Sequence, residues 1–203
     1  MLKYIIFDIG NVLIRFTWKD YIQTLLQDEE AIFHVEKAIW SSGLWNELDR
    51  GVLAEEEILN RMLNYDARYQ SQVALALSNI GECIQKTDYT LPWLQELKKA
   101  GYGIYYLSNN SQYAQNCSKD CLDFMAYMDG GIFSYEVKHV KPYKTIYKRL
   151  CEKYSLEPCQ CVFIDDKQQN VATARALGME AILFTSYEEA RALLNKRLKP
   201  GGS

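Results

Sequence analysis

Five polar residues of this chain share one kind of position, at the end of an apolar run or a short way past one: Asp8, Ser108, Lys141, Asp165 and Asp166. Carboxylates that lie close together repel one another unless a cation sits between them. Mg²⁺ suits such a group, because it takes oxygen ligands and is usually held by one or two carboxylates together with substrate phosphate oxygens. These residue types therefore predict a site for Mg²⁺ and a phosphoryl group.

The same residues fit the chemistry of phosphoryl transfer. The hydroxyl of Ser108, the amides around Asn109 and the ammonium of Lys141 would complement the phosphoryl oxygens. Asp8 would then be free to attack phosphorus in line, since carboxylate nucleophiles form aspartyl-phosphates. A structural role stays open for Asp8, which could cap a turn beside Gly10, and for the Ser-Asn pair, which could cap a helix.

The elements that would position these residues follow from the hydrophobic pattern. Residues 4–7 are a short apolar run that leads into Asp8, which indicates a buried strand. After residue 87, apolar runs alternate with amphipathic segments. The predicted strands are 103–107, 131–134, 161–164 and 181–184, and the predicted helices are 91–100, 112–125, 143–154, 169–177 and 187–198. Such repeats predict an α/β fold with a doubly wound, Rossmann-like parallel sheet, whose carboxyl edge gathers functional residues.

Residues 15–86 have helical periodicity and little strand signal, which predicts a small helical cap inserted after the first strand. The expected core is then 1–14 with 87–203, in which 200–203 form a frayed end. Five cap side chains are candidate substrate contacts: Arg15, Trp18, Trp40, Trp45 and Arg50. The first two are favoured because they follow the first strand closely, although aromatic residues at helical spacing usually pack in a core.

Four motifs occur in a fixed order: Phe7-Asp8-x-Gly10-Asn11-Val12-Leu13, then Leu107-Ser108-Asn109, then Lys141-Pro142, then Phe163-Ile164-Asp165-Asp166 followed by Asn170 and Gly178-Met179. This order resembles the haloacid dehalogenase superfamily over nearly the whole chain. The resemblance implies a Mg²⁺-dependent phosphatase that acts on a small phosphorylated metabolite and carries a small helical cap. It also implies that Asp8 is the nucleophile.

The resemblance implies a role for the other motif residues as well. The implied metal ligands are Asp8, the carbonyl of Gly10, Asp166 and, close behind it, Asp165, with Asn170 orienting the acidic pair. The implied phosphate-binding residues are Ser108, Asn109 and Lys141. Lys141 would contact the nucleophile as well as the phosphate.

One position departs from the family pattern. Phosphatases of this superfamily usually carry a general acid and base, a second aspartate, two residues after the nucleophile, where this chain has Gly10. Such help is typically worth about 10²–10⁴-fold in rate. The Asp-x-Gly-Asn form of the motif is similar to a branch that includes α-glucose-1-phosphate phosphatases, which makes a sugar phosphate the leading substrate. An anomeric phosphate leaves easily and needs an acid less.

Three other interpretations stay open. The missing acid is compatible with a degenerate family member that binds a phospho-ligand without turnover. A metal-independent haloacid dehalogenase would be similar overall, but it has an aromatic residue where Gly10 stands. A receiver domain of the response-regulator type gathers similar side chains around Mg²⁺, but its acidic pair comes first in the chain. Here the pair comes last, and the helical insertion has no counterpart there.

Composition limits the partners. The net charge of −3 and the lack of a basic face argue against nucleic acid, and no apolar run approaches the ~20 residues that span a bilayer. The N-terminus carries no secretory signal pattern, which predicts a cytoplasmic protein. The six cysteines are expected to be reduced, packed thiols, because their spacing and that of the two histidines do not suit zinc. The sequence does not predict the oligomeric state.

Overall fold

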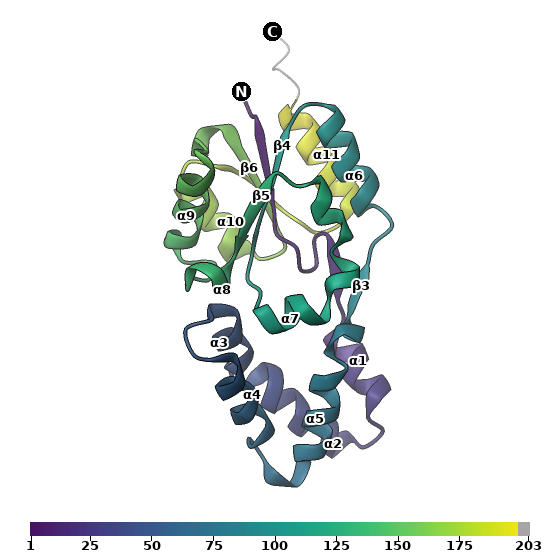
Figure 1. Cartoon of the computed structure of the whole chain (residues 1–203). Helices are drawn as coiled ribbons and strands as arrows, with labels where there is room; N and C mark the ends of the chain where they lie inside the picture. Colours follow the sequence, from purple (N-terminus) through teal and green to yellow (C-terminus); the bar gives the residue numbers. More distant parts are fainter. Residues whose placement is uncertain (199–203) are drawn as a thin grey trace.

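A five-stranded parallel sheet forms the centre of the protein (Figure 1). The structure is a computed structural model and describes residues 1–198. The strands lie in the order β5-β4-β1-β6-β7. Their bounds are β1 Tyr4–Phe7, β4 Gly103–Ser108, β5 Gly130–Phe133, β6 Cys161–Asp165 and β7 Glu180–Leu183. The predicted doubly wound α/β fold is confirmed, and the expected frayed end at 200–203 lies outside the described residues.

Helices cover both faces of this sheet. In Figure 1, α6 and α11 lie on one side of the strands, and α9 and α10 lie on the other. Their bounds are α6 Thr90–Lys99, α9 Lys144–Tyr154, α10 Gln168–Ala176 and α11 Tyr187–Leu198, with a 3₁₀ turn at Pro158–Gln160. Phe7 of β1 packs edge to face on Trp93 of α6, whereas its neighbour Ile6 clusters with Tyr147 and Val171 on the opposite face. β1 is therefore buried on both sides, which explains its unbroken apolar run.

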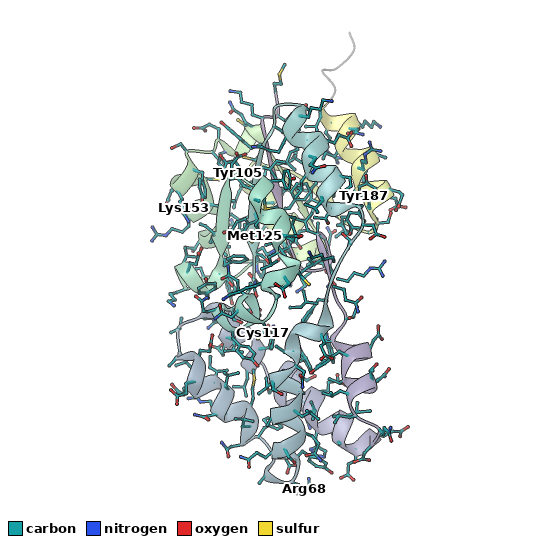
Figure 2. All side chains as sticks on the ribbon, turned by 45° about the vertical axis from the view of Figure 1, so that its right-hand side comes forward. Arg68, Tyr105, Cys117, Met125, Lys153 and Tyr187 are labelled. Atoms are coloured by element: carbon teal, nitrogen blue, oxygen red, sulfur yellow. The ribbon has the colours of Figure 1, made fainter. Side chains whose placement is uncertain are left out.

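A second group of helices lies beyond the carboxyl edge of the sheet, at the bottom of Figure 1. It contains α1 Trp18–Leu25, α2 Glu29–Glu36, a π-helix Lys37–Ser41, α3 Leu44–Arg50, α4 Glu55–Leu63, a 3₁₀ turn Ala67–Tyr69, α5 Gln70–Ser78 and a 3₁₀ turn Ile80–Cys83. The chain enters through β2 (Ile14–Phe16) and leaves through β3 (Ile84–Lys86), which pair antiparallel. The sequence predicted helices here but missed this two-stranded ribbon. Figure 2 shows Arg68 at the far end of the group.

The segment 112–125 differs from its predicted single helix. α7 covers only Gln112–Cys117, and 3₁₀ turns follow at Lys119–Cys121 and Asp123–Tyr127. The hydroxyl of Ser118 donates to the carbonyl of Ala114 at 2.7 Å. A serine that bonds its own backbone competes with continuation of the helix, and the helix ends directly before it. Cys117, the last residue of α7, lies at the level where the helical group meets the sheet half (Figure 2).

The C-terminal end of α3 sits directly on α8 (Ser134–Val137), a short helix where the sequence predicted the end of a strand. The hydroxyl of Ser134 donates to the main-chain carbonyl of Asp49. Just past α3, Gly51 has a φ of +64°, and a Cβ added there would lie 2.8 Å from the Cα of Tyr135. Glycine is the residue that tolerates both this backbone and this approach. The helical group is therefore closed against the sheet half at this point.

The structure also bears on the cysteines and on membrane insertion. All six cysteines are free, as expected, but Cys117 and Cys159 are exposed. The prediction that they are packed is wrong for these two, because Cys117 ends a short helix and Cys159 lies in a surface turn. Within residues 1–198, no helix is long and apolar enough to cross a membrane.

Candidate active site

Three strands bring polar side chains to the carboxyl edge of the sheet. Asp8 directly follows β1, Ser108 ends β4 and Asp165 ends β6. β4 and β6 flank β1 on its two sides, and the strand order reverses beside β1, where parallel α/β sheets open a crevice. The three residues are 7%, 3% and 0% exposed, respectively. They form a buried polar site at the bottom of the sheet.

A buried lysine joins two of the carboxylates. The Nζ atom of Lys141 lies 2.8 Å from Oδ1 of Asp8 and 2.7 Å from Oδ2 of Asp165. Burial lowers the pKa of Lys141, but Asp8 and Asp165 raise it by more, so that it lies above its ordinary value. Lys141 is therefore a charged ammonium. Its position between two anions offsets the high cost of burying it.

The Asp8 carboxyl is oriented by the turn that follows β1. Its Oδ1 accepts a hydrogen bond from the N–H of Ile9 at 2.7 Å, and Asn11 takes a left-handed φ of 58° that turns the chain away from the strand. Burial raises the pKa of Asp8 to about 7, although Lys141 lowers it, and Asp165 raises it again. The charge on Asp8 is thus poorly solvated, and a further cation nearby would stabilise it.

Asp165 is fully buried and is held from several sides. Nδ2 of Asn170 donates to both of its carboxylate oxygens, at 2.9 and 3.0 Å. The main-chain N–H of Lys167 donates to Oδ1 at 2.8 Å, and Lys141 bonds Oδ2. These donors fix the carboxylate in one orientation. Asn170 was expected to orient the pair Asp165-Asp166, and the structure shows hydrogen bonds from its side chain to Asp165.

Asp8, Asp165 and Asp166 form an acidic cluster that fits a divalent cation. Each offers a carboxylate oxygen, and these atoms all lie within 4.8 Å of one another. Burial raises the pKa of Asp166 and the charge of Asp165 adds to this, whereas nearby lysines and the side chain of Asn11 lower it. An all-oxygen donor set of this kind is the one that Mg²⁺ prefers. The repulsion within the cluster is relieved when a cation is bound.

Two cavities at this edge share part of their walls. The first, of about 90 Å³, is mainly apolar but includes the predicted motif residues Gly10, Ser108 and Asn109. The second, of about 380 Å³, is lined by the cationic side chains of Arg50, Lys141 and Lys167. Asn109 and Asp49 belong to both cavities. The two cavities therefore meet at Asn109 and Asp49, with mainly apolar side chains on one side and cationic side chains on the other.

Asn109 holds the main chain of Lys141 with its side chain. Its Nδ2 donates to the carbonyl of Lys141 at 3.0 Å, and its Oδ1 accepts the N–H of Lys141 at 2.7 Å. This reciprocal pair of bonds fixes the loop that carries the lysine. The sequence assigned Asn109 to phosphate binding, but its side chain is used to position Lys141, which leaves the main-chain amide for that role.

Helix α3 brings other residues to the site than the two cap residues that the sequence favoured. Trp45 lines the first cavity and Arg50 the second. Trp18 and Trp40 instead stack on each other with ring centroids 4.7 Å apart, and Arg15 is exposed. The preference for Arg15 and Trp18 stays a prediction. Neither residue lines these two cavities, because the chain leaves the site along β2 and returns to it at α3.

Asp49, which lies in the last turn of α3, was not predicted from the sequence as a site residue. Its side chain is buried, with a residue exposure of 8%, and its Oδ1 has no hydrogen-bond partner among residues 1–198. Burial raises the pKa of Asp49 to about 7, while Lys167 lowers it and Asp8 raises it. One signal was available in the sequence, since an acidic residue at the C-terminal end of a helix opposes the helix dipole.

This sheet and its acidic edge define the class of protein, and comparison with known families agrees with it. The model of the haloacid dehalogenase-like hydrolases matches residues 2–178. The chain belongs to this family of hydrolases, as its motifs predicted.

Relatives cover most of the chain at low identity. It is 24% identical over 190 residues to the sesquiterpene phosphatase astK of Aspergillus oryzae, with 90% of each protein covered. It is 23% identical to the D-ribitol-5-phosphate phosphatase of Bacteroides thetaiotaomicron, covering 89% of this chain and 90% of the relative. A haloacid dehalogenase family enzyme of that bacterium, crystallised with magnesium and inorganic phosphate, superposes with a TM-score of 0.73 at 20% identity, covering 94% and 99% of the two chains.

Proposed function

We propose that this protein is a Mg²⁺-dependent phosphomonoesterase that hydrolyses a small phosphorylated metabolite through an aspartyl-phosphate on Asp8. The observation that carries the proposal is the buried network in which Lys141 joins Asp8 to Asp165, beside Asp166. Support comes from relatives that are named as phosphatases and from the structural neighbour that holds magnesium and phosphate.

Each residue of the network has a role in this chemistry. Asp8, Asp166 and the carbonyl of Gly10 would hold Mg²⁺, which supplies positive charge to the phosphoryl oxygens when bound. Lys141, kept in place by Asp165, adds a second positive charge beside the nucleophile. Asp8 attacks phosphorus as the bond to the leaving oxygen breaks, which gives an acyl phosphate. Water then attacks phosphorus, the bond to Asp8 breaks, and inorganic phosphate leaves.

The hydroxyl of Ser108 and the main-chain amide of Asn109 would bind the remaining phosphoryl oxygens. Both residues line the first cavity next to Gly10. Hydrogen bonds to a charged phosphate are about twice as strong as neutral ones. Two donors and a lysine together would orient the phosphoryl group for attack by Asp8.

For the leaving group, a sugar phosphate is the finer proposal. Phe16 and Trp45 stack at 6.0 Å between ring centroids and form an aromatic wall of the first cavity. An aromatic wall suits the apolar face of a compact ring. A panel of sugar phosphates, prenyl phosphates and flavin mononucleotide, assayed for phosphate release, tests this choice. Turnover confined to prenyl phosphates or the flavin would reject the sugar.

The catalytic proposal is tested with p-nitrophenyl phosphate. The wild-type protein should release p-nitrophenol in Mg²⁺ and lose this activity in EDTA, and Asp8→Asn should be inactive. Asp20→Asn is the matched control, because Asp20 is an exposed carboxylate on α1. It should retain wild-type activity. Turnover that survives EDTA or the Asp8→Asn change contradicts the proposal, as does phosphate binding without turnover.

A further inference from the structure

Proton transfer in this site has no group at the usual place. The residue two positions after Asp8 is Gly10, and it has no side chain to carry a proton. Lys141 already contacts both Asp8 and Asp165, so that its protons are held by two anions. Hydrolysis of an unactivated phosphate ester nevertheless requires a proton for the leaving oxygen. Another acid has to supply it.

Asp49 is the acidic residue that the site itself leaves unused. It lies on the wall that the two cavities share, together with Asn109, and it comes from the helical group, whereas Asp8 comes from the sheet. Its main chain is held by the bond from Ser134. Its Oδ1 is buried and unpartnered among the described residues. Buried polar atoms in native proteins nearly always have a partner, and an exception calls for a functional explanation.

The charges around Asp49 are compatible with a proton carrier. Lys167 and Lys141 lie on the sheet side, and they favour the ionised form, whereas Asp8 disfavours it. On α3 itself, Arg50 lines the polar cavity. On α8, the carboxylate of Glu136 is bonded to the N–H of Phe133. Burial outweighs these charges and keeps the pKa of Asp49 well above its ordinary value, so that a protonated and an ionised form are both accessible near neutral pH.

We propose that Asp49 is the general acid and base of this enzyme, supplied by α3 in place of the missing aspartate at Gly10. The inference rests on the proposed phosphatase function. In the first step, the carboxyl proton of Asp49 passes to the leaving oxygen as the phosphorus bond to that oxygen breaks and the bond to Asp8 forms. In the second step, the Asp49 carboxylate takes a proton from the attacking water. Phosphorus then separates from Asp8, and Asp49 is protonated again.

The test compares leaving groups in Asp49→Asn. With an alkyl substrate such as phenethyl phosphate, whose leaving group is poor, kcat/KM should fall by about 10²–10⁴-fold. With p-nitrophenyl phosphate, which needs no acid, the fall in kcat/KM should be much smaller. The wild-type kcat/KM should decline at alkaline pH as Asp49 loses its proton, and this decline should be absent in the variant. Asp49→Glu, which restores a carboxyl, should recover part of both effects.

A second readout follows the water step. In Asp49→Asn, p-nitrophenol should appear in a burst that matches the enzyme concentration and should then slow, because the aspartyl-phosphate forms but its hydrolysis lacks a base. A residue that only binds substrate or supports the fold would lower activity on both substrates equally, with no burst and an unchanged pH profile. That result overturns the inference.

The controls separate this inference from the function on which it rests. Asp20→Asn, which removes an exposed carboxylate from the same helical group, should match the wild type in every assay. Thermal melting should show that the Asp49 variants are folded. If the wild type itself shows no Mg²⁺-dependent turnover, the proposed function fails and the inference fails with it. If the wild type is active and Asp49→Asn behaves like it on the alkyl substrate, only the inference fails.

Discussion

The stability of the metal-free Asp49→Asn protein relative to the wild type should increase with pH. Burial raises the pKa of Asp49 from 3.8 to about 7, with Lys167 opposing and Asp8 adding to the rise. Because the folded pKa lies above the unfolded one, the native state binds this proton more tightly than the unfolded chain does. The contribution to stability is complete below about pH 4 and is lost as the pH rises through about 7. Asparagine does not titrate.

The size of the effect follows from the two pKa values. Each unit of pKa difference between the folded and unfolded states corresponds to about 1.4 kcal/mol. The difference in unfolding free energy, Asp49→Asn minus wild type, should therefore increase by about 4 kcal/mol between pH 4 and pH 8. The absolute offset depends on how well the amide fits the buried position of the Asp49 side chain, but the slope with pH does not.

Urea unfolding at a series of pH values in EDTA measures this slope. Both proteins should give the same m-value, so that the change appears in the midpoint. The Asp20→Asn protein is the matched control, because this change removes an exposed carboxylate from the same group of helices. A flat or falling difference for Asp49→Asn would refute the reasoning, since it would mean that the Asp49 carboxylate is as stable in the native site as in water.

Three further predictions concern the ion network and the contact between α3 and α8. Lys141→Met should lower the unfolding free energy in EDTA by about 3–5 kcal/mol, because two buried carboxylates lose their shared cation. In urea unfolding, Mg²⁺ should restore part of the lost stability, and an unchanged midpoint in EDTA would contradict the prediction. Asn170→Ala should weaken Mg²⁺ binding by about 10–100-fold in calorimetry, because Asp165 loses both hydrogen bonds from Nδ2 of Asn170. Equal affinity would show that Mg²⁺ binding does not depend on how Asp165 is oriented. Gly51→Ala should cost more stability than Gly43→Ala, since both have positive φ but a Cβ at residue 43 meets nothing within 4 Å; equal losses in thermal melts would argue against the close approach to Tyr135.

Much of the sheet could be predicted from the sequence because its signals are local. β1 is short, apolar on both faces and directly followed by Asp8, so that its type and its end are both visible in the residues themselves. The meeting of Asp8, Ser108 and Asp165 follows from a general property of parallel sheets, which gather the carboxyl ends of strands at one edge. The structure places these side chains at that edge.

What the sequence did not predict depends on contacts between distant segments. β2 and β3 are each three residues long and become strands by pairing across the whole helical group. The side chain of Asn109 could not be assigned to Lys141 because the two are separated by 32 positions. In the sequence, only the position of Asp49 near the C-terminal end of a helix sets it apart from other acidic residues, and its burial depends on tertiary packing. Tertiary packing, not local pattern, decided these positions.

The ribbon of β2 and β3 has a mechanical consequence for the helices that it carries. The chain passes from the sheet half to the helical group and back through this one pair of strands. A rigid-body rotation of the helices away from the sheet would therefore have its hinge at β2 and β3. Away from this ribbon, α3 is held to the sheet half by Ser134. Its hydroxyl donates to the carbonyl of Asp49 and accepts a hydrogen bond from the N–H of Asn110 at 3.0 Å. Movement of α3 away from α8 would break the bond from Ser134 to Asp49 and leave the same hydroxyl to donate to the carbonyl of Asn110, which lies 3.2 Å away. The position of the helices is therefore linked to the hydrogen bonding of the loop that follows Ser108.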